Sequence, residues 1–592
     1  MRQHFIAQGL HELYNTASGI PGKHHSRMRL GVSTLKHQLH YFGIVENPTC
    51  EWCHLADETV HHYLLAYMPD RCTVDHIFCL YAIGQKQLCQ KGGRCYMLFI
   101  DFSKAFDRVQ HKFLWYRMIT YGLHGNVLRV LRSMYSQLKS CVRTPQGLTE
   151  FFECKMGTRQ GCMVSPLLFL MYINEFVNHL TENGCEGIYV TPECPNVLCL
   201  MYADDIVSVA TSVENLQSQL DTLYDFCERW GMKVNTGKTK IMVCRNGGPL
   251  RRVESWKLGN VRVEPTTYYK YLGVMFSSRL IWSKTVQTLA DQAQKAINML
   301  SSFESKHGPL NFKCAFHIFD KMIAPILLYG SEVWGFDHRK QIEQVQLKYC
   351  KRHLGVAASA CNAAVLGDCG RLPMSVFYMT RLIKYWLRLT CMRYDRYPRQ
   401  CYDMLYALDV ERSQTWATSV RNILYKYGFG FVWINQGVGD MNSFVEVFKQ
   451  RLIDCATQEW HDNMMTNERL RDYCTYKSLL EPEKYVTDIT IHKYKKALAK
   501  LRTSNHSLHI EKGRHQKVCV EDRICMWCKN VRGENIVENE YHFISICPLY
   551  ENVRKKMMNE SVTYIEIMKD TVTVCRFVYS AFQCRNRYYS LL

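Results

Sequence analysis

The chain has 592 residues, enough for several hydrophobic cores at roughly 150 residues per domain. Its 47% hydrophobic and 22% charged residues are typical of a globular protein and argue against a disordered chain. The formal net charge of +20 favours a polyanionic partner, although a membrane surface or plain solubility would also explain it. The longest apolar stretches, residues 167–173 and 323–328, are far shorter than the roughly 18 residues needed to span a bilayer, so we expect no membrane association.

The cysteine content indicates the cellular environment. The chain has 28 cysteines, and its amino terminus lacks the apolar core of a secretory signal. We therefore expect an intracellular, reducing location, in the cytoplasm or the nucleus. Most cysteines there are buried thiols or metal ligands rather than disulfides. The sequence gives no oligomeric state.

Five segments differ in character along the chain. Residues 1–70 are rich in histidine, residues 71–278 alternate apolar strands with helical patterns, and residues 279–355 have apolar residues at helical spacing. Residues 356–515 are mostly helical, aromatic and basic, and residues 516–592 contain a Cys-x-x-Cys pair. These patterns predict an α+β domain followed by helical segments and a small carboxy-terminal segment.

Two predicted strand regions end in acidic residues. Residues 95–100 form a continuous apolar run, typical of a buried strand, and Asp101 follows directly. The apolar residues 197–202 and 206–210 flank a short acidic turn. Two apolar strands joined in this way predict a β-hairpin with carboxylates at its tip.

The acids of this turn are Asp204 and Asp205. Adjacent acids in a turn are often only turn formers, because Asp tolerates the backbone angles of turns. A third acid at another strand end, Asp101, changes the interpretation, because like charges brought together need a counter-ion. Magnesium suits such a site, since it takes hard oxygen ligands. Two Mg²⁺ ions about 4 Å apart can activate a hydroxyl nucleophile and stabilise a pyrophosphate leaving group.

Five motifs along this region resemble, in order and spacing, those of the reverse transcriptases of non-LTR (LINE-like) retrotransposons. They are residues 99–107 (FIDFSKAFD, motif A), 157–162 with 165–169 (GTRQGC and SPLLF, motif B), 202–205 (YADD, motif C), 230–235 with 238–240 (WGMKVN and KTK, motif D) and 269–273 (YKYLG, primer grip). Residues 323–335 resemble the thumb of the family. The resemblance implies a right-hand polymerase palm with an antiparallel sheet, a helical thumb over 279–355 and a helical connector over 356–515.

The resemblance also implies roles for individual residues. Asp101 and Asp204 would be the main ligands of two Mg²⁺ ions, with Asp205 as the supporting acid and the backbone carbonyl of Phe102 reaching one ion. Phe106 occupies the sugar-gate position, where an aromatic ring leaves no room for a ribose 2′-hydroxyl and selects deoxynucleotides. By composition alone, Phe106 would also suit the core beside a strand.

Three further residues are expected to contact the nucleotide. Gln160 and Gly161 lie in the motif B loop, and Lys238 lies where the motif D lysine of the family approaches the triphosphate and can act as general acid. We also expect Ser165 and Pro166 to start a helix as N-cap and first helical residue. The partners implied are an RNA template, a DNA primer and deoxynucleoside triphosphates.

A possible zinc site lies near the carboxy terminus. Cys525 and Cys528 have the spacing of a zinc-finger pair, and His542 and Cys547 supply two further ligands. The surrounding residues resemble the carboxy-terminal zinc knuckle of these retroelement proteins, which implies Zn²⁺ with a structural or RNA-gripping role. The alternative is a set of buried thiols in a cysteine-rich chain.

A second, incomplete cluster lies near the amino terminus. Cys50, Cys53 and His62 begin a similar pattern, but Tyr67 stands where many such elements have a cysteine. Cys72 could replace it only if the loop rearranged. We therefore interpret residues 1–70 as a degenerate knuckle-like segment.

The chain also departs from the family pattern. Residues 1–70 show no match to a fingers subdomain, and no endonuclease domain is recognisable, so we expect a truncated element in which catalysis is impaired. Two alternatives to an active polymerase remain at this point. One is a catalytically inactive nucleic-acid-binding protein, and the other is a retroelement remnant without a function in its host.

Overall fold

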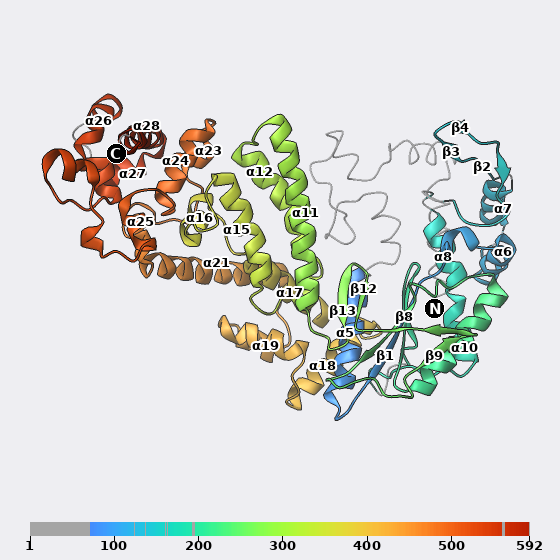
Figure 1. Cartoon of the computed structure of the whole chain (residues 1–592). Coiled ribbons are helices and arrows are strands. Elements are labelled where there is room, and N and C mark those ends of the chain that lie inside the picture. The colour runs from blue at the N-terminus through green and yellow to red at the C-terminus, as the bar shows by residue number, and fades with distance from the viewer. Residues whose placement is uncertain are drawn as a thin grey trace. The chain divides into compact units, whose positions relative to one another are not determined.

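The computed structural model describes residues 72–123, 125–136, 138–159, 162, 164–191, 196–558 and 563–590. The chain divides into two compact units (Figure 1). The first unit comprises residues up to Trp282 together with Met392–Thr418, and the second comprises Ser283–Cys391 and Ser419–Leu592. The segment Met392–Thr418 therefore returns to the first unit from within the stretch that the sequence pattern assigns to the connector.

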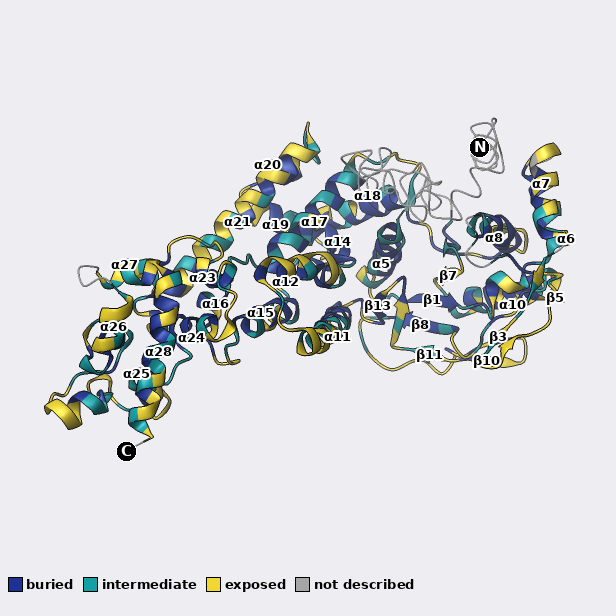
Figure 2. Cartoon of the chain, turned by 90° about the horizontal axis from the view of Figure 1, so that it is seen from above, coloured by how far each residue is buried: buried dark blue, intermediate teal, exposed yellow. Residues whose placement is uncertain are grey.

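A five-stranded sheet with the order β11-β8-β1-β7-β6 forms the centre of the first unit. Its central strand is β1 (Cys95–Ile100), which pairs antiparallel with both neighbours, β7 (Asp205–Ala210) and β8 (Lys240–Cys244). All six residues of β1 are buried, and Figure 2 shows the strand as dark blue. A strand covered on both faces needs apolar residues throughout, which is why a continuous run rather than an alternating one encodes it. The predicted strand is confirmed.

Helices cover one face of this sheet. Tyr96, Leu98 and Ile100 share a core with residues of α8 (Ser165–Ile173) and α10 (Val213–Trp230). On α10, Leu216, Leu220, Leu223 and Phe226 are fully buried, at the three- and four-residue spacing of an apolar helix face.

The other face of β1 meets α5 (Thr73–Cys89) and the hairpin of β12 (Tyr268–Tyr271) and β13 (Val274–Ser277). Close packing against α5 depends on Gly84, because an added Cβ would lie 3.1 Å from the methyl carbon of Met97. Phe99 stacks on Tyr269 with ring centroids 4.1 Å apart. The central strand is thus covered on both faces, and the acids stand where it and its neighbours end.

The remaining elements of the first unit are short or peripheral. They are η1 (Ala105–Arg108), α6 (His111–Thr120), α7 (Gly125–Tyr135), α9 (Glu175–Glu182), β6 (Cys199–Tyr202), β9 (Trp256–Leu258), β10 (Val261–Val263), β11 (Pro265–Thr266), α18 (Tyr397–Val410), and the two-residue strands β2 (Lys139–Ser140), β3 (Arg143–Thr144), β4 (Gly147–Leu148) and β5 (Phe152–Glu153). Helix α18 packs against α5 within this unit.

The start of α8 differs from the prediction. The helix begins at Ser165, so Val164 rather than Ser165 occupies the N-cap, and no side chain caps it. The Ser165 hydroxyl instead donates to the carbonyl of Arg159 at 2.7 Å. The serine therefore fixes the preceding loop instead of capping the helix, and this tertiary hydrogen bond overrides the local preference.

The described part of the second unit is helical. Its helices are α11 (Ser283–His307), α12 (Phe312–Ile318), η2 (Phe319–Ile323), α13 (Ala324–Leu327), α14 (Ser331–Trp334), α15 (Lys340–Leu354), α16 (Asn362–Cys369), α17 (Met374–Thr390), α19 (Trp416–Lys426, entering from the first unit), α20 (Gly430–Ile434), α21 (Met441–Met465), η3 (Glu468–Leu470), α22 (Tyr473–Tyr476), α23 (Lys484–Thr487), α24 (His492–Arg502), α25 (His509–His515), η4 (Val520–Asp522), η5 (Cys528–Arg532), η6 (His542–Ile546), η7 (Pro548–Tyr550), α26 (Glu551–Met557), α27 (Tyr564–Lys569) and α28 (Thr571–Tyr589). The predicted helical character of residues 279–515 holds for this unit.

A buried ion pair lies in the core of the second unit. Arg502 of α24 is 1% exposed and donates to both carboxylate oxygens of Asp368, which is fully buried, at 2.8 to 3.1 Å. The hydroxyls of Tyr473 and Tyr485 donate to the same carboxylate at 2.8 and 2.6 Å. A buried charge is tolerated only when it is paired and hydrogen-bonded in this way. The network therefore fixes how these helices pack.

No helix among the described residues is long and apolar enough to cross a membrane. None of the cysteines that the structure describes forms a disulfide.

Candidate active site and metal cluster

The three predicted acids lie at the same end of the central sheet. Strands β6 and β7 form the predicted hairpin, in which Tyr202 pairs with Asp205, so Ala203 and Asp204 make the turn. Ala203 has a φ of +52°, and a positive φ at the first turn residue matches the twist of a two-residue hairpin. On the other side of β7, Ile100 pairs with Ile206, and continuing this register places Asp101 opposite Asp205. The hairpin prediction is confirmed.

The charges of these acids act on one another. Partial desolvation of the Asp205 carboxyl, then the negative charges of Asp204 and Asp101, raise its pKa above the usual value. Burial followed by the charges of Asp101 and Asp205 also raises the pKa of Tyr269 to about 12. Asp204 and Asp205 are exposed, whereas Asp101 is half-buried. The site is therefore an accessible concentration of negative charge, which a divalent cation would stabilise.

The motif D segment is hydrogen-bonded to motif A. The Asn235 N–H donates to the Asp101 carbonyl at 2.7 Å, and the Asp101 N–H donates to the Thr239 hydroxyl at 3.1 Å. The Ser103 N–H donates to the Lys233 carbonyl at 2.7 Å. The loop between Asn235 and Thr239 is thus attached directly to the residue expected to bind metal.

The backbone of Phe102 lies between these hydrogen bonds. Phe102 pairs with Val234 as an isolated bridge, and the bonds to Asp101 and Ser103 flank it. In an antiparallel ladder this is a non-hydrogen-bonded pair, which leaves the carbonyl of Phe102 out of the bridge. The geometry is compatible with the predicted use of that carbonyl as a ligand.

Motif B packs against the loop that follows motif A. The Phe106 ring packs against the Phe169 ring of α8 with centroids 4.6 Å apart, and the Phe106 carbonyl accepts from the Thr158 N–H at 2.8 Å. Gly157 has a φ of +89°, and an added Cβ would lie 2.9 Å from the carbonyl oxygen of Asp107. Only glycine allows this approach without strain. Phe106, the predicted sugar gate, is half-buried and is held in place by Phe169 and by Thr158.

Of the three other residues predicted to contact the nucleotide, the structure describes one. Lys238 is exposed in the loop anchored to Asp101, and its N–H donates to the Asn235 carbonyl at 3.1 Å. Gln160 and Gly161 lie outside the described residues, as does the amino-terminal cluster up to residue 71. The roles of these residues remain predictions.

Two residues near the acids had no role assigned from sequence. Thr239 is fully buried and accepts the Asp101 N–H, while Tyr269 covers Phe99 beside the acids. Both stand in recognised motifs, but their positions relative to Asp101 depend on pairing between distant segments, which local patterns do not encode.

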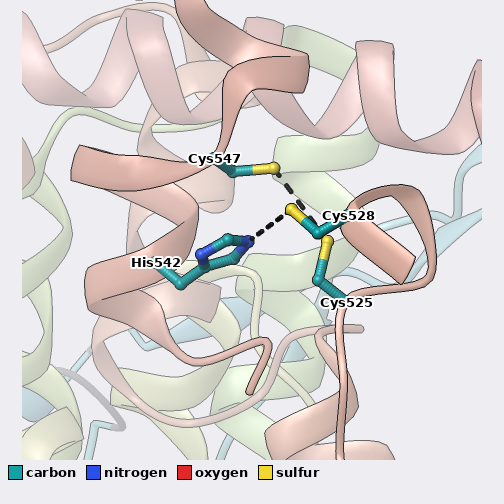
Figure 3. Close-up of side chains that lie close together, drawn as sticks. All are labelled: Cys525, Cys528, His542 and Cys547. Atoms are coloured by element: carbon teal, nitrogen blue, oxygen red, sulfur yellow. Dashed lines mark hydrogen bonds between the residues drawn. The ribbon is translucent and has the colours of Figure 1, made fainter. Parts of the chain in front are cut away.

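A second cluster lies in the second unit. The ligand atoms of Cys525, Cys528, His542 and Cys547 all lie within 4.8 Å of one another, and all four residues are buried (Figure 3). Among the described residues, no other His, Cys, Asp or Glu side chains converge this closely in a group of three or more. The sulfur atoms of Cys525 and Cys547 are 4.0 Å apart, and the Cys528 sulfur is 3.5 Å from His542 Nε2. Tetrahedral zinc requires about 3.8 Å between sulfurs and about 3.6 Å from sulfur to nitrogen. The ligand set predicted from sequence is brought together, at spacings that fit zinc.

The surrounding structure holds the cluster in place. The Cys525 N–H donates to the Ile536 carbonyl at 2.7 Å, and Arg554 donates to the Cys547 carbonyl at 3.1 Å. Arg585 of α28 forms two hydrogen bonds of 2.7 Å with Glu538, and both side chains are buried. These contacts fix the ligand positions, and all four ligand residues are buried.

The thiols of the cluster cannot all ionise without a cation. The neighbouring Cys547 thiol, helped by His542, holds the pKa of Cys525 well below its usual range. Burial and the charge of Cys525 raise the pKa of Cys528 to about 11, and the same neighbour raises the pKa of Cys547. Ionisation of one thiol therefore disfavours ionisation of the next, and a bound zinc ion would lower the pKa of all three thiols.

Comparison with known families agrees with the motif pattern. Residues 23–276 match the family described as reverse transcriptase (RNA-dependent DNA polymerase). The match starts at residue 23 and so includes residues 23–70, for which the sequence motifs gave no fingers subdomain. A solved structure of telomerase from Candida albicans with a fragment of telomeric RNA aligns over 70% of this chain and 58% of its own, at 12% identity. Its TM-score of 0.30 supports no argument about the fold.

Curated relatives come from non-LTR elements. The chain is 25% identical over 268 residues to a probable RNA-directed DNA polymerase from transposon BS of Drosophila melanogaster, covering 43% of this chain and 28% of that protein. It is 24% identical over 281 residues to the RNA-directed DNA polymerase from mobile element jockey of Drosophila funebris, covering 46% and 29%. The chain thus matches less than a third of the length of these relatives. With its motifs, its acidic sheet end and these matches, the chain carries a reverse transcriptase domain of the non-LTR, LINE-like retrotransposon family.

Proposed function

We propose that this chain is an RNA-directed DNA polymerase that extends a DNA primer on an RNA template with deoxynucleoside triphosphates. The observation that carries the proposal is the register of β1 and β7, which places Asp101 beside Asp205 and next to the turn residue Asp204. Three acids at one accessible strand end are suited to nucleotidyl transfer.

Asp101, Asp204 and the Phe102 carbonyl would hold two Mg²⁺ ions, with Asp205 adding negative charge behind them. When bound, magnesium supplies activation of the primer hydroxyl and neutralisation of the pyrophosphate. The residues of the chain provide the positioning. The Asn235 N–H donates to the Asp101 carbonyl and the Thr239 hydroxyl accepts from the Asp101 N–H, so the backbone that carries the Asp101 carboxylate is fixed.

Phe106 would select the sugar of the incoming nucleotide. Its ring is backed by Phe169 and its carbonyl is bonded to Thr158, so the ring cannot easily withdraw from a 2′-hydroxyl. Gln160 and Gly161, the motif B residues, would contact the nucleotide. Lys238 would donate a proton to the departing pyrophosphate from the loop attached to Asp101.

The buried Cys/His cluster would bind one Zn²⁺ through Cys525, Cys528, His542 and Cys547. Its four ligand positions are all filled by side chains, which is typical of a structural site. Its role would be to fix the carboxy-terminal segment against α28, where Glu538 pairs with Arg585.

Primer extension tests the polymerase proposal. The purified chain is given a DNA primer annealed to an RNA template, deoxynucleotides and Mg²⁺, next to Asp204→Ala. The matched control is Asp221→Ala, which removes an exposed acid of α10 away from the sheet end. We expect extension by the parent and the control, and none by Asp204→Ala. Folded, RNA-binding parent protein that extends no primer would contradict the proposal and favour a catalytically inactive binding protein or a remnant.

A further inference from the structure

A pocket of about 530 Å³ lies in the second unit, between α24 and α28. Four of the residues that line it are lysines, namely Lys493, Lys496, Lys500 and Lys512, and the described lining contains no carboxylate. None of the four lysines forms an ion pair with an acidic residue in the part of the chain that the structure describes. Converging cations without counter-charges attract a polyanion.

Aromatic rings stand among these lysines. Tyr579 and Phe582 of α28 line the same pocket and are half-buried. The Lys493 ammonium lies 5.2 Å from the centre of the Tyr579 ring, and Phe582 packs on Phe543 at 4.6 Å. Half-buried rings next to cations suit stacking with unpaired bases, while lysines contact the phosphates. Free phosphate or a lipid headgroup would use the lysines but not the rings.

A buried histidine adds a polar group to the same wall. The side chain of His506 is fully buried and lines the pocket. Its Nε2 atom is bonded to Glu540 at 3.1 Å, while its Nδ1 atom has no partner among the described residues. Buried polar atoms are normally satisfied, so this unpaired atom leaves unused hydrogen-bonding capacity in a residue of the pocket wall. This observation is independent of the lysines.

From these three features we propose that the α24–α28 pocket binds single-stranded nucleic acid, with phosphates on the lysines and bases on Tyr579 and Phe582. The site belongs to the second unit and contains none of the acids of the sheet end, so it can bind whether or not the polymerase proposal holds.

Fluorescence anisotropy with a labelled oligouridylate of about twelve nucleotides tests the site on the full chain. The variant Lys496→Ala/Lys500→Ala is compared with Lys426→Ala/Lys569→Ala, which removes two exposed lysines of the same unit outside the pocket. Each lost phosphate contact lowers the salt slope by about 0.7, so the pocket variant should lose about 1.4 in slope and about 20-fold in affinity at 0.1 M salt. Equal losses in the two variants would overturn the proposal.

A second variant separates nucleic acid from other polyanions. Tyr579→Leu should weaken oligouridylate binding about tenfold and leave heparin binding unchanged, because only bases stack. Oligothymidylate should respond as oligouridylate does. An equal effect on heparin would overturn the nucleic-acid assignment in favour of a general anion site.

Crosslinks from 4-thiouridine RNA to the parent chain should map to α24 or α28, and crosslinks confined to other segments would contradict the proposal even if a variant misfolded. Primer extension on a pre-annealed duplex reports the sheet-end site separately.

Discussion

The acidic end of the sheet in the first unit and the buried ion pair in the second unit differ in whether their charges are compensated by partners. At the sheet end, Asp204 and Asp205 are exposed and repel one another. In the second unit, Asp368 accepts hydrogen bonds from Arg502 and two tyrosines and is fully buried. A site that must receive ions and substrate keeps its charges open and unsatisfied, whereas a structural site satisfies each one.

The same contrast separates the two candidate metal sites. The Cys/His ligands converge within 4.8 Å and are buried, while the acids stand at an accessible hairpin tip. A closed set of four ligands stabilises the fold, and an open set of acids leaves coordination positions for phosphates. Substitutions of the acids at the sheet end should therefore affect catalysis far more than stability, and substitutions in the Cys/His cluster the reverse.

The largest effect is expected from Asp101→Asn. Loss of one anionic metal ligand should lower the rate of primer extension by about 10⁴-fold, equivalent to about 5.5 kcal/mol of transition-state stabilisation. The melting temperature should stay within about 1 °C, because the asparagine keeps the shape and removes a repulsive charge. Single-turnover extension and thermal unfolding measure the two effects, with Asp221→Asn as control. A large drop in melting temperature would break the comparison.

Cys528→Ala should have the reverse signature. The variant should lose bound zinc and about 5 kcal/mol of the free energy of unfolding of the second unit, since metal binding and folding are coupled. Elemental analysis of the metal and denaturant unfolding provide the measurements. Cys519→Ser is the control, because Cys519 is exposed and outside the cluster. A parent chain that purifies folded and without zinc would contradict the zinc proposal.

Asp368→Ala tests the buried pair. Removing one partner leaves the Arg502 guanidinium buried without its counter-charge, so we expect a loss of about 4 kcal/mol in the free energy of unfolding. Asp320 makes a comparable pair with Arg371, but it is 48% exposed. Asp320→Ala should therefore cost less than about 1 kcal/mol. Similar losses in urea unfolding of the two variants would show that burial does not decide the strength of these pairs.

Asp205→Asn should give the smallest effect, and a stabilising one. The pKa of Asp205 is raised above its usual value of 3.8, so the folded state binds a proton more tightly than the unfolded state. The proton-linked stabilisation is complete below the usual value and disappears as the pH rises through the raised one. At pH 7.5 without Mg²⁺, the variant should melt about 1–2 °C higher than the parent, and the difference should vanish at low pH. A variant less stable than the parent at pH 7.5 would contradict the repulsion.

Local patterns in the sequence were sufficient to predict the strands that carry the three acids. The apolar run 95–100 encodes a strand buried on both faces, and the acidic turn between two such runs encodes the hairpin of β6 and β7. Burial and turn geometry depend on neighbouring residues, so both can be read without knowing the rest of the fold. The cysteine spacing likewise identified the four ligands that the structure gathers.

Only the tertiary structure decided which of these elements meet. The order of the sheet and its register place Asp101 opposite Asp205, Thr239 against Asp101 and Tyr269 over Phe99. The lysine pocket arises because α24 packs on α28, about eighty residues later in the chain. A register shift of one residue would turn every side chain of a strand to the other face, and what prevents it is packing across the whole core. The sequence by itself determined the secondary-structure elements and the side chains they carry, because both depend on neighbouring residues. Long-range packing decided which of these elements lie next to one another.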